Sequence, residues 1–503
     1  MDSQQFREFG KAAVDYIADY FDNIKDRPVL PSVKPGYLED LLPDEAPEHG
    51  ESWQDVMQDV DQIIMPGITH WHSPNFHAYY PTAHSFPAVV GEMMSAGFGC
   101  IGLSWVASPA YTELEVVMMN WLGKLLNLPE EFLNCSEGVG GGVIQGSASE
   151  VTFIALLAAK EKMVKDLLEA NSPLTEGEIK AKLVAYSSDQ SNSSVEKSGL
   201  LGSMPMSLLK ADKDGKLRGD TLQKAFQEDK AKGLIPCYVV ANLGTTPTCA
   251  FDDLTELGEV CNKENVWLHV DAAYAGTAFI CPEYQHYMKG VELAESFNFN
   301  PHKWMLVNFD CSAMWVKNAK YLVEAFNVER IYLKDKHKGL APEYRHWQIS
   351  LGRRFRALKL WFVLRIYGVE GLRKHVRDQI SLAKYFEEFV VKDERFELCT
   401  SSMGLVCFRL KGDDHLTEKL LHVVSERRNI FVIAGHFNGK ECIRFAICSR
   451  LTQREDVEYA WKEFLAATEQ IVSSKAKITC EVTGKKILSA ELTKMANHTE
   501  KSK

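Results

Sequence analysis

The chain has 503 residues, 46% of them hydrophobic, which allows a large buried core and more than one packing unit. Its formal net charge is −11, and an acidic chain without a basic block argues against nucleic acid as a partner. The 12 cysteines are scattered without a C-x-x-C pair, and the N-terminus lacks the pattern of a signal peptide. We therefore expect a reducing, cytoplasmic setting and no zinc site.

Residues 1–85 predict an N-terminal helical arm followed by proline-rich loops. Apolar side chains recur at alternating spacings of three and four residues, which places them on one helix face. An arm this apolar is expected to pack on another surface, such as a second subunit. The residues of this face are Phe6, Phe9, Ala13, Tyr16 and Tyr20.

Residues 93–112 carry no charge, and twenty such residues are long enough to span a bilayer. The run contains three Gly, three Ser and a Pro, and it lacks flanking basic residues. We interpret it as a buried, turn-rich segment of the core and expect no membrane span. The nearby histidines His70, His72, His77 and His84 suggest a metal site, but their aromatic neighbours fit a substrate pocket better, and no metal is expected.

Residues 86–370 predict a large domain. From about 140 to 320, β-rich runs such as "LVAYSS" and "IPCYVVANLG" alternate with helical patterns. This alternation predicts a mostly parallel sheet with helices on both faces, in which ligands bind at the C-terminal ends of the strands.

Residues 371–473 predict a small α+β domain that starts with a helix at 371–391. Asn438-Gly439 lies between two β-rich runs and is a strong hairpin signal. Residues 474–503 predict a flexible tail.

The stretch "GVGGGVIQGSASE" predicts a glycine-rich turn that leads into a helix capped by Ser147. Free N–H groups at such a helix start can bind an anion. A tight turn with an ordinary N-cap explains these residues equally well.

Two further residues are candidates for a role in a reaction. Asp271 ends an apolar strand, where a carboxylate needs a partner, although a strand-end cap is an alternative. Lys303 lies among aromatic residues in "FNFNPHKW", where desolvation favours a nucleophilic amine, although a lysine that snorkels to the surface is an alternative. An anion site, a carboxylate and a lysine are together what pyridoxal phosphate requires.

The chain resembles the aromatic L-amino acid decarboxylases, which are fold type I pyridoxal phosphate enzymes. The resemblance runs from about residue 1 to 472 and includes "PGITHWHSP", "GGGVIQGSASE", "LHVDAAYAG", "FNFNPHKW" and "YRHWQISLGRRFR". It implies an α/β fold with a mostly parallel seven-stranded sheet, pyridoxal 5′-phosphate as cofactor, and a homodimer with shared active sites. It also implies that the arm of residues 1–85 interlocks the two subunits.

The resemblance implies a role for each matching residue. Catalysis is implied for Lys303, which would carry the cofactor as a Schiff base, and for Asn192, His302 and Tyr332, the last in a mobile loop. Cofactor binding is implied for Ser147, Ala148, Ser149, Thr246, Asp271, Ala273, Asn300, Lys303 and Leu351. Substrate binding is implied for Trp71, Tyr79, Tyr80, Pro81, Thr82, Ile101, Leu103 and Arg353, with Ile101 and Leu103 reaching in from the partner subunit.

Asn192, in the polar stretch "SSDQSNSSVEKS", departs from the decarboxylase pattern, which has a histidine at this position. An amide is neither aromatic nor titratable, so we expect slow protonation of Cα after CO2 leaves. O2 can then react, and L-DOPA would give 3,4-dihydroxyphenylacetaldehyde, ammonia and H2O2. In this respect the chain resembles the insect-type aldehyde synthases. An amine-forming decarboxylase and a non-catalytic cofactor-binding protein are the alternatives.

Overall fold

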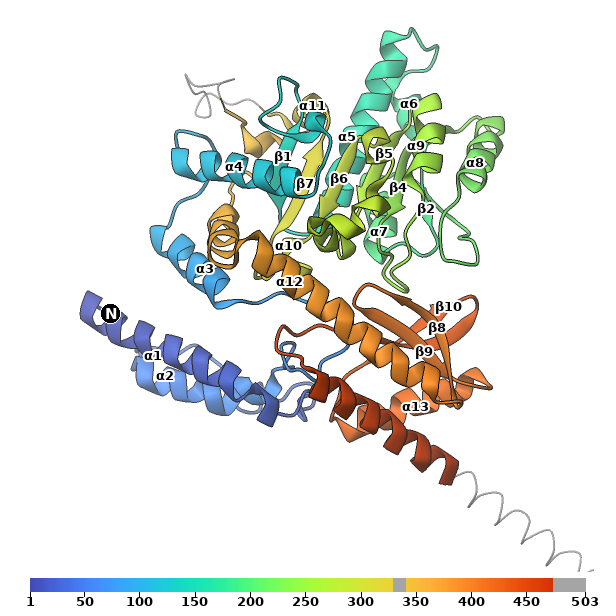
Figure 1. The fold of residues 1–503 in the computed structure, drawn as a ribbon. Coiled ribbons are helices and arrows are strands. Elements are labelled where there is room, and N and C mark those ends of the chain that lie inside the picture. The colour runs from blue at the N-terminus through green and yellow to red at the C-terminus, as the bar shows by residue number, and fades with distance from the viewer. Residues whose placement is uncertain (329–340, 474–503) are drawn as a thin grey trace, which may run out of the picture.

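The computed structural model describes residues 1–328 and 341–473. An N-terminal helical arm projects from one side, below a large α/β domain and beside a smaller domain with its own sheet (Figure 1). The first helices are α1 (Ser3–Asp22), α2 (Trp53–Asp59), α3 (Phe86–Phe98) and α4 (Pro109–Leu125).

The central sheet of the large domain confirms the mostly parallel arrangement predicted from the sequence. Its seven strands lie in the order β1-β7-β6-β5-β4-β2-β3. Strand β7 is antiparallel to both of its neighbours, whereas all pairs from β6 to β3 are parallel. The strands are β1 (Gly141–Gln145), β2 (Leu183–Ser188), β3 (Met206–Leu209), β4 (Ile235–Asn242), β5 (Trp267–Asp271), β6 (Ser296–Phe299) and β7 (Ser312–Val316).

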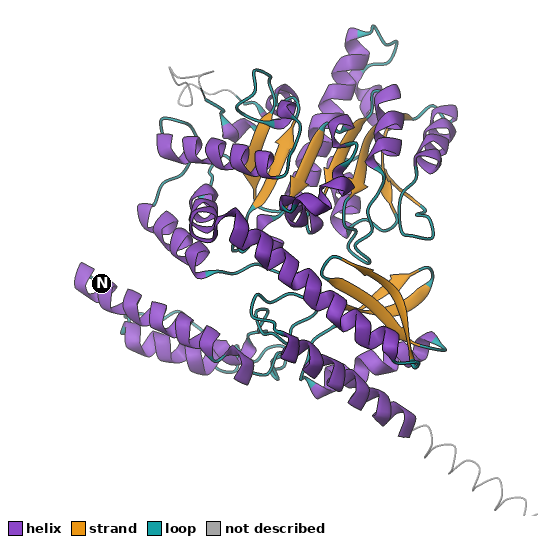
Figure 2. Ribbon diagram, in the orientation of Figure 1, coloured by secondary structure: helices purple, strands orange, loops and turns teal. Residues whose placement is uncertain are grey.

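Helices cover both faces of this sheet (Figure 2). Successive side chains of a strand point to opposite faces, so β4 contributes to two cores. Tyr238 and Val240 pack in the cluster that contains α5, whereas Val239 and Ala241 pack in the cluster that contains α4, α8 and α9. The helices of this region are α5 (Ala148–Glu169), α6 (Glu176–Lys182), α7 (Ser193–Gly202), α8 (Gly219–Ala231), α9 (Leu254–Lys263), α10 (Pro301–Trp304) and α11 (Lys320–Phe326).

The smaller domain contains an antiparallel sheet in the order β10-β11-β9-β8. Its elements are β8 (Phe396–Ser402), β9 (Leu405–Leu410), α13 (Asp414–Arg427), β10 (Ile433–Phe437), β11 (Lys440–Ala446) and a helix over 454–473. The predicted hairpin is confirmed: Asn438 and Gly439 connect β10 to β11 with φ of 51° and 74°. Positive φ at both positions is what a type I′ turn requires.

Helix α12 (Arg356–Lys392) connects the two domains (Figure 1). The sequence predicted a helix only over 371–391. In the structure the helix begins at Arg356 and is interrupted at Gly368, which has φ of 64° and ψ of 172°. Glycine adopts this conformation readily because it has no Cβ.

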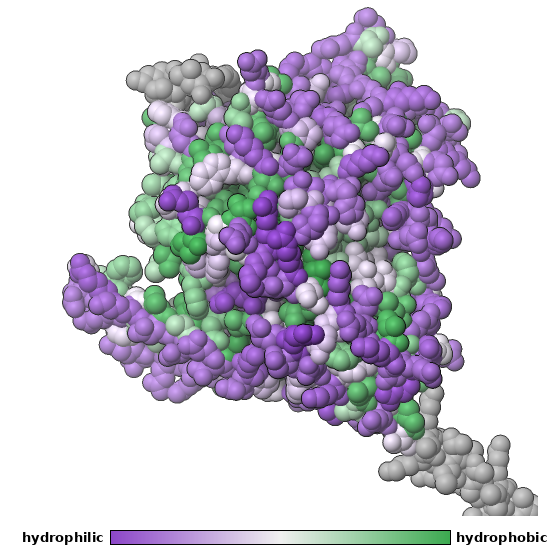
Figure 3. All heavy atoms as spheres, viewed as in Figure 1, coloured by the Kyte–Doolittle hydropathy of each residue, from purple (hydrophilic) through white to green (hydrophobic). Residues whose placement is uncertain are grey.

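Residues 93–106 correct one prediction, because they are not a buried part of the core. Met93, Phe98, Ile101 and Val106 are 47%, 55%, 58% and 60% exposed. Apolar surface gathers on this side of the molecule, above the projecting arm (Figure 3). An uncharged sequence does not distinguish core from a surface that meets another chain. Over residues 1–328 and 341–473, no helix has both the length and the apolar character to cross a bilayer.

Residues 77–83, between α2 and α3, connect the two domains through hydrogen bonds. The N–H of His77 donates to the Phe431 carbonyl at 2.8 Å, and the N–H of Ala446 donates to the His77 carbonyl at 3.0 Å. Further along, the N–H of Ala83 donates to the carbonyl of His302 at 2.7 Å. An N-terminal segment thereby lies between the small domain and helix α10.

Candidate active site

A cavity of about 240 Å³ lies at the C-terminal ends of β4, β5 and β6. This edge is where ligands bind in open α/β sheets. The lining is Tyr80, Ser147, Ala148, Ser149, Asn192, Ser194, Asn242, Gly244, Thr246, Asp271, Ala273, Tyr274, Asn300, His302 and Lys303. The structure therefore brings the glycine-rich turn, the strand-end carboxylate and the lysine together.

A larger and more open cleft, of about 800 Å³, lies between residues 25–32 and the small domain. Lys25, Arg27 and Arg428 line it. Since Lys303, Asp271 and the glycine-rich turn all line the smaller cavity, that cavity is the candidate active site.

Asp271 and Lys303 form the charged centre of the cavity. Asp271 ends β5 and accepts a hydrogen bond from the N–H of Ala273 at 2.9 Å. Burial raises the pKa of Asp271, while Lys303 and the Ala273 N–H lower it. Desolvation lowers the pKa of Lys303, which the charge of Asp271 counteracts. A lysine with a lowered pKa has more of the neutral amine that attacks carbonyl groups.

The glycine-rich turn positions the start of α5. Ser147 is the N-cap, and its hydroxyl accepts from the N–H of Glu150 at 3.2 Å, as predicted. The Glu150 carboxylate accepts from the N–H of Gly146 at 3.0 Å. Within the described residues, the N–H groups of Ala148 and Ser149 have no hydrogen-bond partner. These amides, together with the helix dipole, suit an anionic group.

Asn300 lies across from this turn, at the end of β6. Its Oδ1 accepts from the Ser312 hydroxyl at 2.7 Å. This hydrogen bond fixes the orientation of the amide, so that Nδ2 is the group with hydrogen atoms to donate. Asn300 also precedes α10, the short helix that carries His302 and Lys303.

Asn192 lies in the cavity wall, between β2 and α7. It is the N-cap of α7, and its Oδ1 accepts from the N–H of Ser194 at 3.0 Å. Its Nδ2 donates to the Thr246 hydroxyl at 3.0 Å. Both the oxygen and the nitrogen of the side-chain amide are therefore hydrogen-bonded. The amide has no group that exchanges a proton near neutral pH.

His302 lines the cavity in its neutral form. Burial, together with the neighbouring Lys303, lowers its pKa to about 3. Its Nδ1 accepts from the N–H of Cys311 at 2.8 Å, so the ring proton is on Nε2.

The aromatic residues implied for substrate binding lie at different depths. Tyr80 lines the cavity, and Pro81 and Thr82 line a small recess that also adjoins Lys303. Trp71 and Tyr79 are 36% and 46% exposed and stack on each other with ring centroids 5.2 Å apart. They lie outside the cavity lining of this single chain.

Four other implied residues do not line the cavity. Ile101 and Leu351 are 58% and 45% exposed, and Leu103 is half-buried. Arg353 belongs to a buried ion pair: its Nη2 donates to Glu115 Oε1 at 2.6 Å and to the Ile144 carbonyl at 3.0 Å. Tyr332 lies outside the described residues.

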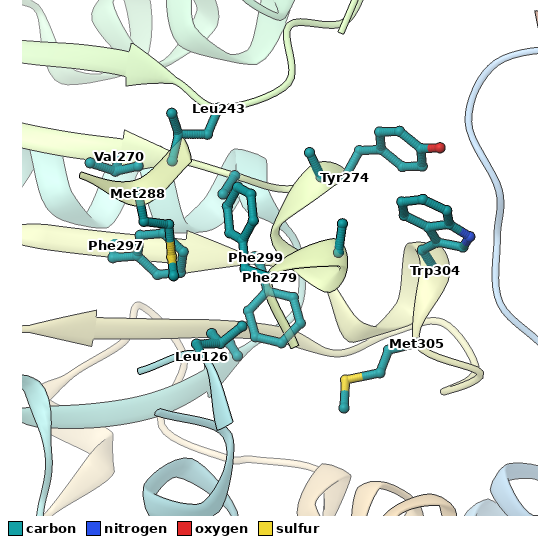
Figure 4. Packing of buried hydrophobic residues seen from close by; sticks show 14 of the residues in the cluster. Leu126, Leu243, Val270, Tyr274, Phe279, Met288, Phe297, Phe299, Trp304 and Met305 are labelled. Atoms are coloured by element: carbon teal, nitrogen blue, oxygen red, sulfur yellow. The ribbon is translucent and has the colours of Figure 1, made fainter. Parts of the chain in front are cut away.

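Four lining residues were not predicted from the sequence: Ser194, Asn242, Gly244 and Tyr274. Asn242 ends β4 and is paired in register with Asp271, so its position at a strand end was an available signal. Tyr274 stacks on Trp304 with ring centroids 4.7 Å apart, and both rings belong to the buried core of the large domain (Figure 4). Their contact joins segments that are distant in the sequence, which no local pattern reveals.

Known proteins match this chain over most of its length. The pyridoxal-dependent decarboxylase conserved domain matches residues 35–411. The aromatic-L-amino-acid decarboxylase of Drosophila simulans is 58% identical over 94% of this chain and 92% of its own length. The 3,4-dihydroxyphenylacetaldehyde synthase of Aedes aegypti is 56% identical over 94% of this chain and 91% of its own. The crystal structure of Oryza sativa TDC with PLP and tryptamine has a TM-score of 0.90 and 34% identity, covering 94% of this chain and 99% of that one.

Proposed function

This chain belongs to the pyridoxal-dependent decarboxylase family, close to the aromatic-L-amino-acid decarboxylases, and we propose that it converts L-DOPA to 3,4-dihydroxyphenylacetaldehyde. Its cofactor is pyridoxal 5′-phosphate. The overall reaction consumes L-DOPA, O2 and water and releases the aldehyde, CO2, ammonia and H2O2. Amine-forming and aldehyde-forming relatives are about equally similar to this chain, so the proposal depends on the site.

The residues of the cavity fit this cofactor. The unpartnered N–H groups of Ala148 and Ser149, at the start of α5, suit its phosphate. Asp271 suits its ring nitrogen, and the Lys303 amine suits its aldehyde. Ala273 and Thr246 also line the cavity. When bound, the cofactor withdraws electrons from the substrate Cα, which allows CO2 to leave.

The chain's own residues then determine where protons can go. Asp271 carries the negative charge that holds a proton on a ring nitrogen beside it. His302 is neutral and can donate through Nε2. Thr246 is held by Asn192, so its hydroxyl oxygen already accepts one hydrogen bond.

The presence of Asn192 in this cavity is the main support for the proposal. It lies in the same cavity as Lys303 and Asp271, at the position where the amine-forming pattern has histidine. Its amide cannot supply a proton to Cα, and general acid assistance is typically worth ~10²–10⁴-fold in rate. A barrier difference of about 1.4 kcal/mol changes the partition between protonation and reaction with O2 tenfold. Loss of one proton donor is therefore enough to redirect the product.

The experiment that tests the proposal is product analysis of the wild type and Asn192→His with L-DOPA, measuring aldehyde, amine, H2O2 and CO2 together. The wild type should give aldehyde and one H2O2 per CO2. In Asn192→His the amine should increase, and O2 uptake and H2O2 should fall together. Asn192→Gln is the matched control, since it keeps the amide and should keep the aldehyde product.

Two results would defeat the proposal. One is a wild-type protein that makes only dopamine with no O2 dependence, which would establish the amine-forming alternative. The other is a folded, cofactor-loaded Asn192→His protein with an unchanged ratio of aldehyde to amine.

We also propose that the active form is a homodimer. The exposed apolar residues of α3 and the following loop, including Met93, Phe98 and Ile101, form a surface that favours burial against a second copy. The arm beside it is mostly exposed, with Phe6 63% exposed. Sedimentation at assay concentration should give a dimer, and a fully active monomer would exclude it.

A further inference from the structure

Arg444 is a buried cation of the small domain that packs against Tyr80, a residue of the cavity lining. It lies on β11 and is 3% exposed. Its Nε donates to the Pro247 carbonyl at 3.0 Å, and its guanidinium carbon lies 5.0 Å from the centre of the Tyr80 ring. Among the described residues, no carboxylate pairs with it, and its Nη2 is buried without a hydrogen-bond partner. A buried charge without a counter-ion is costly and rarely retained without a role.

Its contacts converge on the loop that carries Thr246. Arg444 binds the carbonyl of Pro247 on one side of Thr246, and the Tyr80 hydroxyl donates to the carbonyl of Thr245 on the other side at 3.0 Å. Thr246 in turn accepts the hydrogen bond of Asn192. The guanidinium and the Tyr80 ring therefore hold this loop from two sides.

The same tyrosine links Arg444 to Lys303. The Tyr80 ring stacks on Tyr274 with centroids 3.9 Å apart, and Tyr274 stacks on Trp304, the residue after Lys303. Lys303 Nζ itself lies 5.8 Å from the centre of the Tyr80 ring. The Arg444 guanidinium and the Lys303 amino group thus approach one aromatic ring.

Gly435 makes room for this arrangement. A Cβ added at Gly435 would lie 2.7 Å from both Cγ and Cδ of Arg444. Gly435 lies on β10, beside β11, so its lack of a side chain lets the arginine stem cross the sheet toward Tyr80.

We propose that Arg444 is a positioning residue of the reaction, which fixes Tyr80 and the loop 245–247 and places a positive charge behind Lys303. This inference rests on the proposed role of Lys303 in binding the cofactor. The positive charge of Arg444 lowers the pKa of Lys303, in addition to the effect of burial. The other titratable or charged groups around Lys303 are Asp271, His302, Tyr80 and Tyr274 in the cavity and His72, His84, His375, Cys448 and Arg450 around the adjoining recess.

The test is a pH titration of the visible absorbance of the cofactor in the holoenzyme without substrate. Arg444→Gln removes the charge and should raise the midpoint by roughly one pH unit, since a nearby positive charge disfavours the protonated form of the linkage. Arg444→Lys keeps the charge and should keep the midpoint. It loses the hydrogen bond to Pro247, so KM for L-DOPA should rise about three- to tenfold. Arg409→Gln is the matched control, since Arg409 is also buried in this sheet but binds Asp414 and the Gly412 carbonyl.

A folded, cofactor-loaded Arg444→Gln protein with the wild-type midpoint would overturn the inference, as would an equal shift in Arg409→Gln. Gly435→Ala displaces the arginine without removing it, and it should shift the midpoint in the same direction if Arg444→Gln does not fold. An unchanged midpoint in that variant would likewise count against the inference. If Lys303 does not bind the cofactor, the wild type itself will show no pH-dependent change in the visible absorbance. That result is distinguishable from a titration whose midpoint does not depend on Arg444.

Discussion

Replacing Arg353 by methionine tests whether this residue supports the fold or binds substrate. Arg353 and Glu115 are 1% and 0% exposed, and their charged groups are 2.6 Å apart. Removing the guanidinium leaves a buried carboxylate whose remaining partner is the N–H of Ile144 at 2.7 Å. Breaking a buried pair in this way costs about 3–5 kcal/mol, because one charge stays in the interior without a counter-ion.

The assay is urea unfolding at fixed protein and cofactor concentrations. Arg353→Met should lower the free energy of unfolding by about 3–5 kcal/mol. Glu115→Gln/Arg353→Met should recover most of the loss, because an amide oxygen still accepts from Ile144. Arg395→Met is the control: its pair with Asp393 is exposed and should contribute less than about 1 kcal/mol. An Arg353→Met protein of wild-type stability with a strongly raised KM would refute this reasoning and support direct substrate binding.

Substitutions at three other positions have defined outcomes. Burial lowers the pKa of His77 to about 3, so the unfolded chain takes up a proton near pH 6.5 that the folded chain does not. His77 alone should contribute about 2 kcal/mol to the loss of stability between neutral pH and pH 5, in addition to the contribution of other buried histidines such as His302. The side chain introduced in His77→Asn can still donate to the Ala446 carbonyl. Unfolding of this variant should therefore show a loss of stability at pH 5 that is about 2 kcal/mol smaller than that of the wild type. Lys303→Ala and Lys303→Arg should abolish both the visible absorbance of the cofactor and turnover, and retention of both would exclude Lys303 as the attachment site. Gly439→Ala should reduce the free energy of unfolding by about 1 kcal/mol in denaturant titration, since φ of 74° is strained for any residue with a Cβ.

The sequence predicted features that local chemistry determines. The cap at Ser147, the turn at Asn438-Gly439 and the strand that ends at Asp271 depend on neighbouring residues alone, and the structure contains each of them. Strand ends also indicated the edge of the sheet where the cavity lies.

Long-range packing accounts for what the sequence did not predict. The uncharged run at 93–112 was expected to be core, but much of it is exposed, because apolar composition does not reveal whether a surface faces its own chain or another one. Nothing near Arg353 in the sequence indicates its ion pair with Glu115, and its role in substrate binding stays a prediction. The contacts of Arg444 join the small domain to Tyr80, which is distant in the chain.

The hydrogen bonds of His77 have a consequence for synthesis on the ribosome. His77 and Ala446 are 369 residues apart, yet they are bonded to each other through backbone and ring. At 5–20 residues per second, roughly 20–75 s pass between the emergence of the two partners. During that time the part of the chain around His77 lacks its hydrogen-bond partners in the small domain, although Tyr80 and Ala83 can already contact the large domain. The pocket wall that includes Tyr80 can therefore be completed only when the small domain has left the exit tunnel.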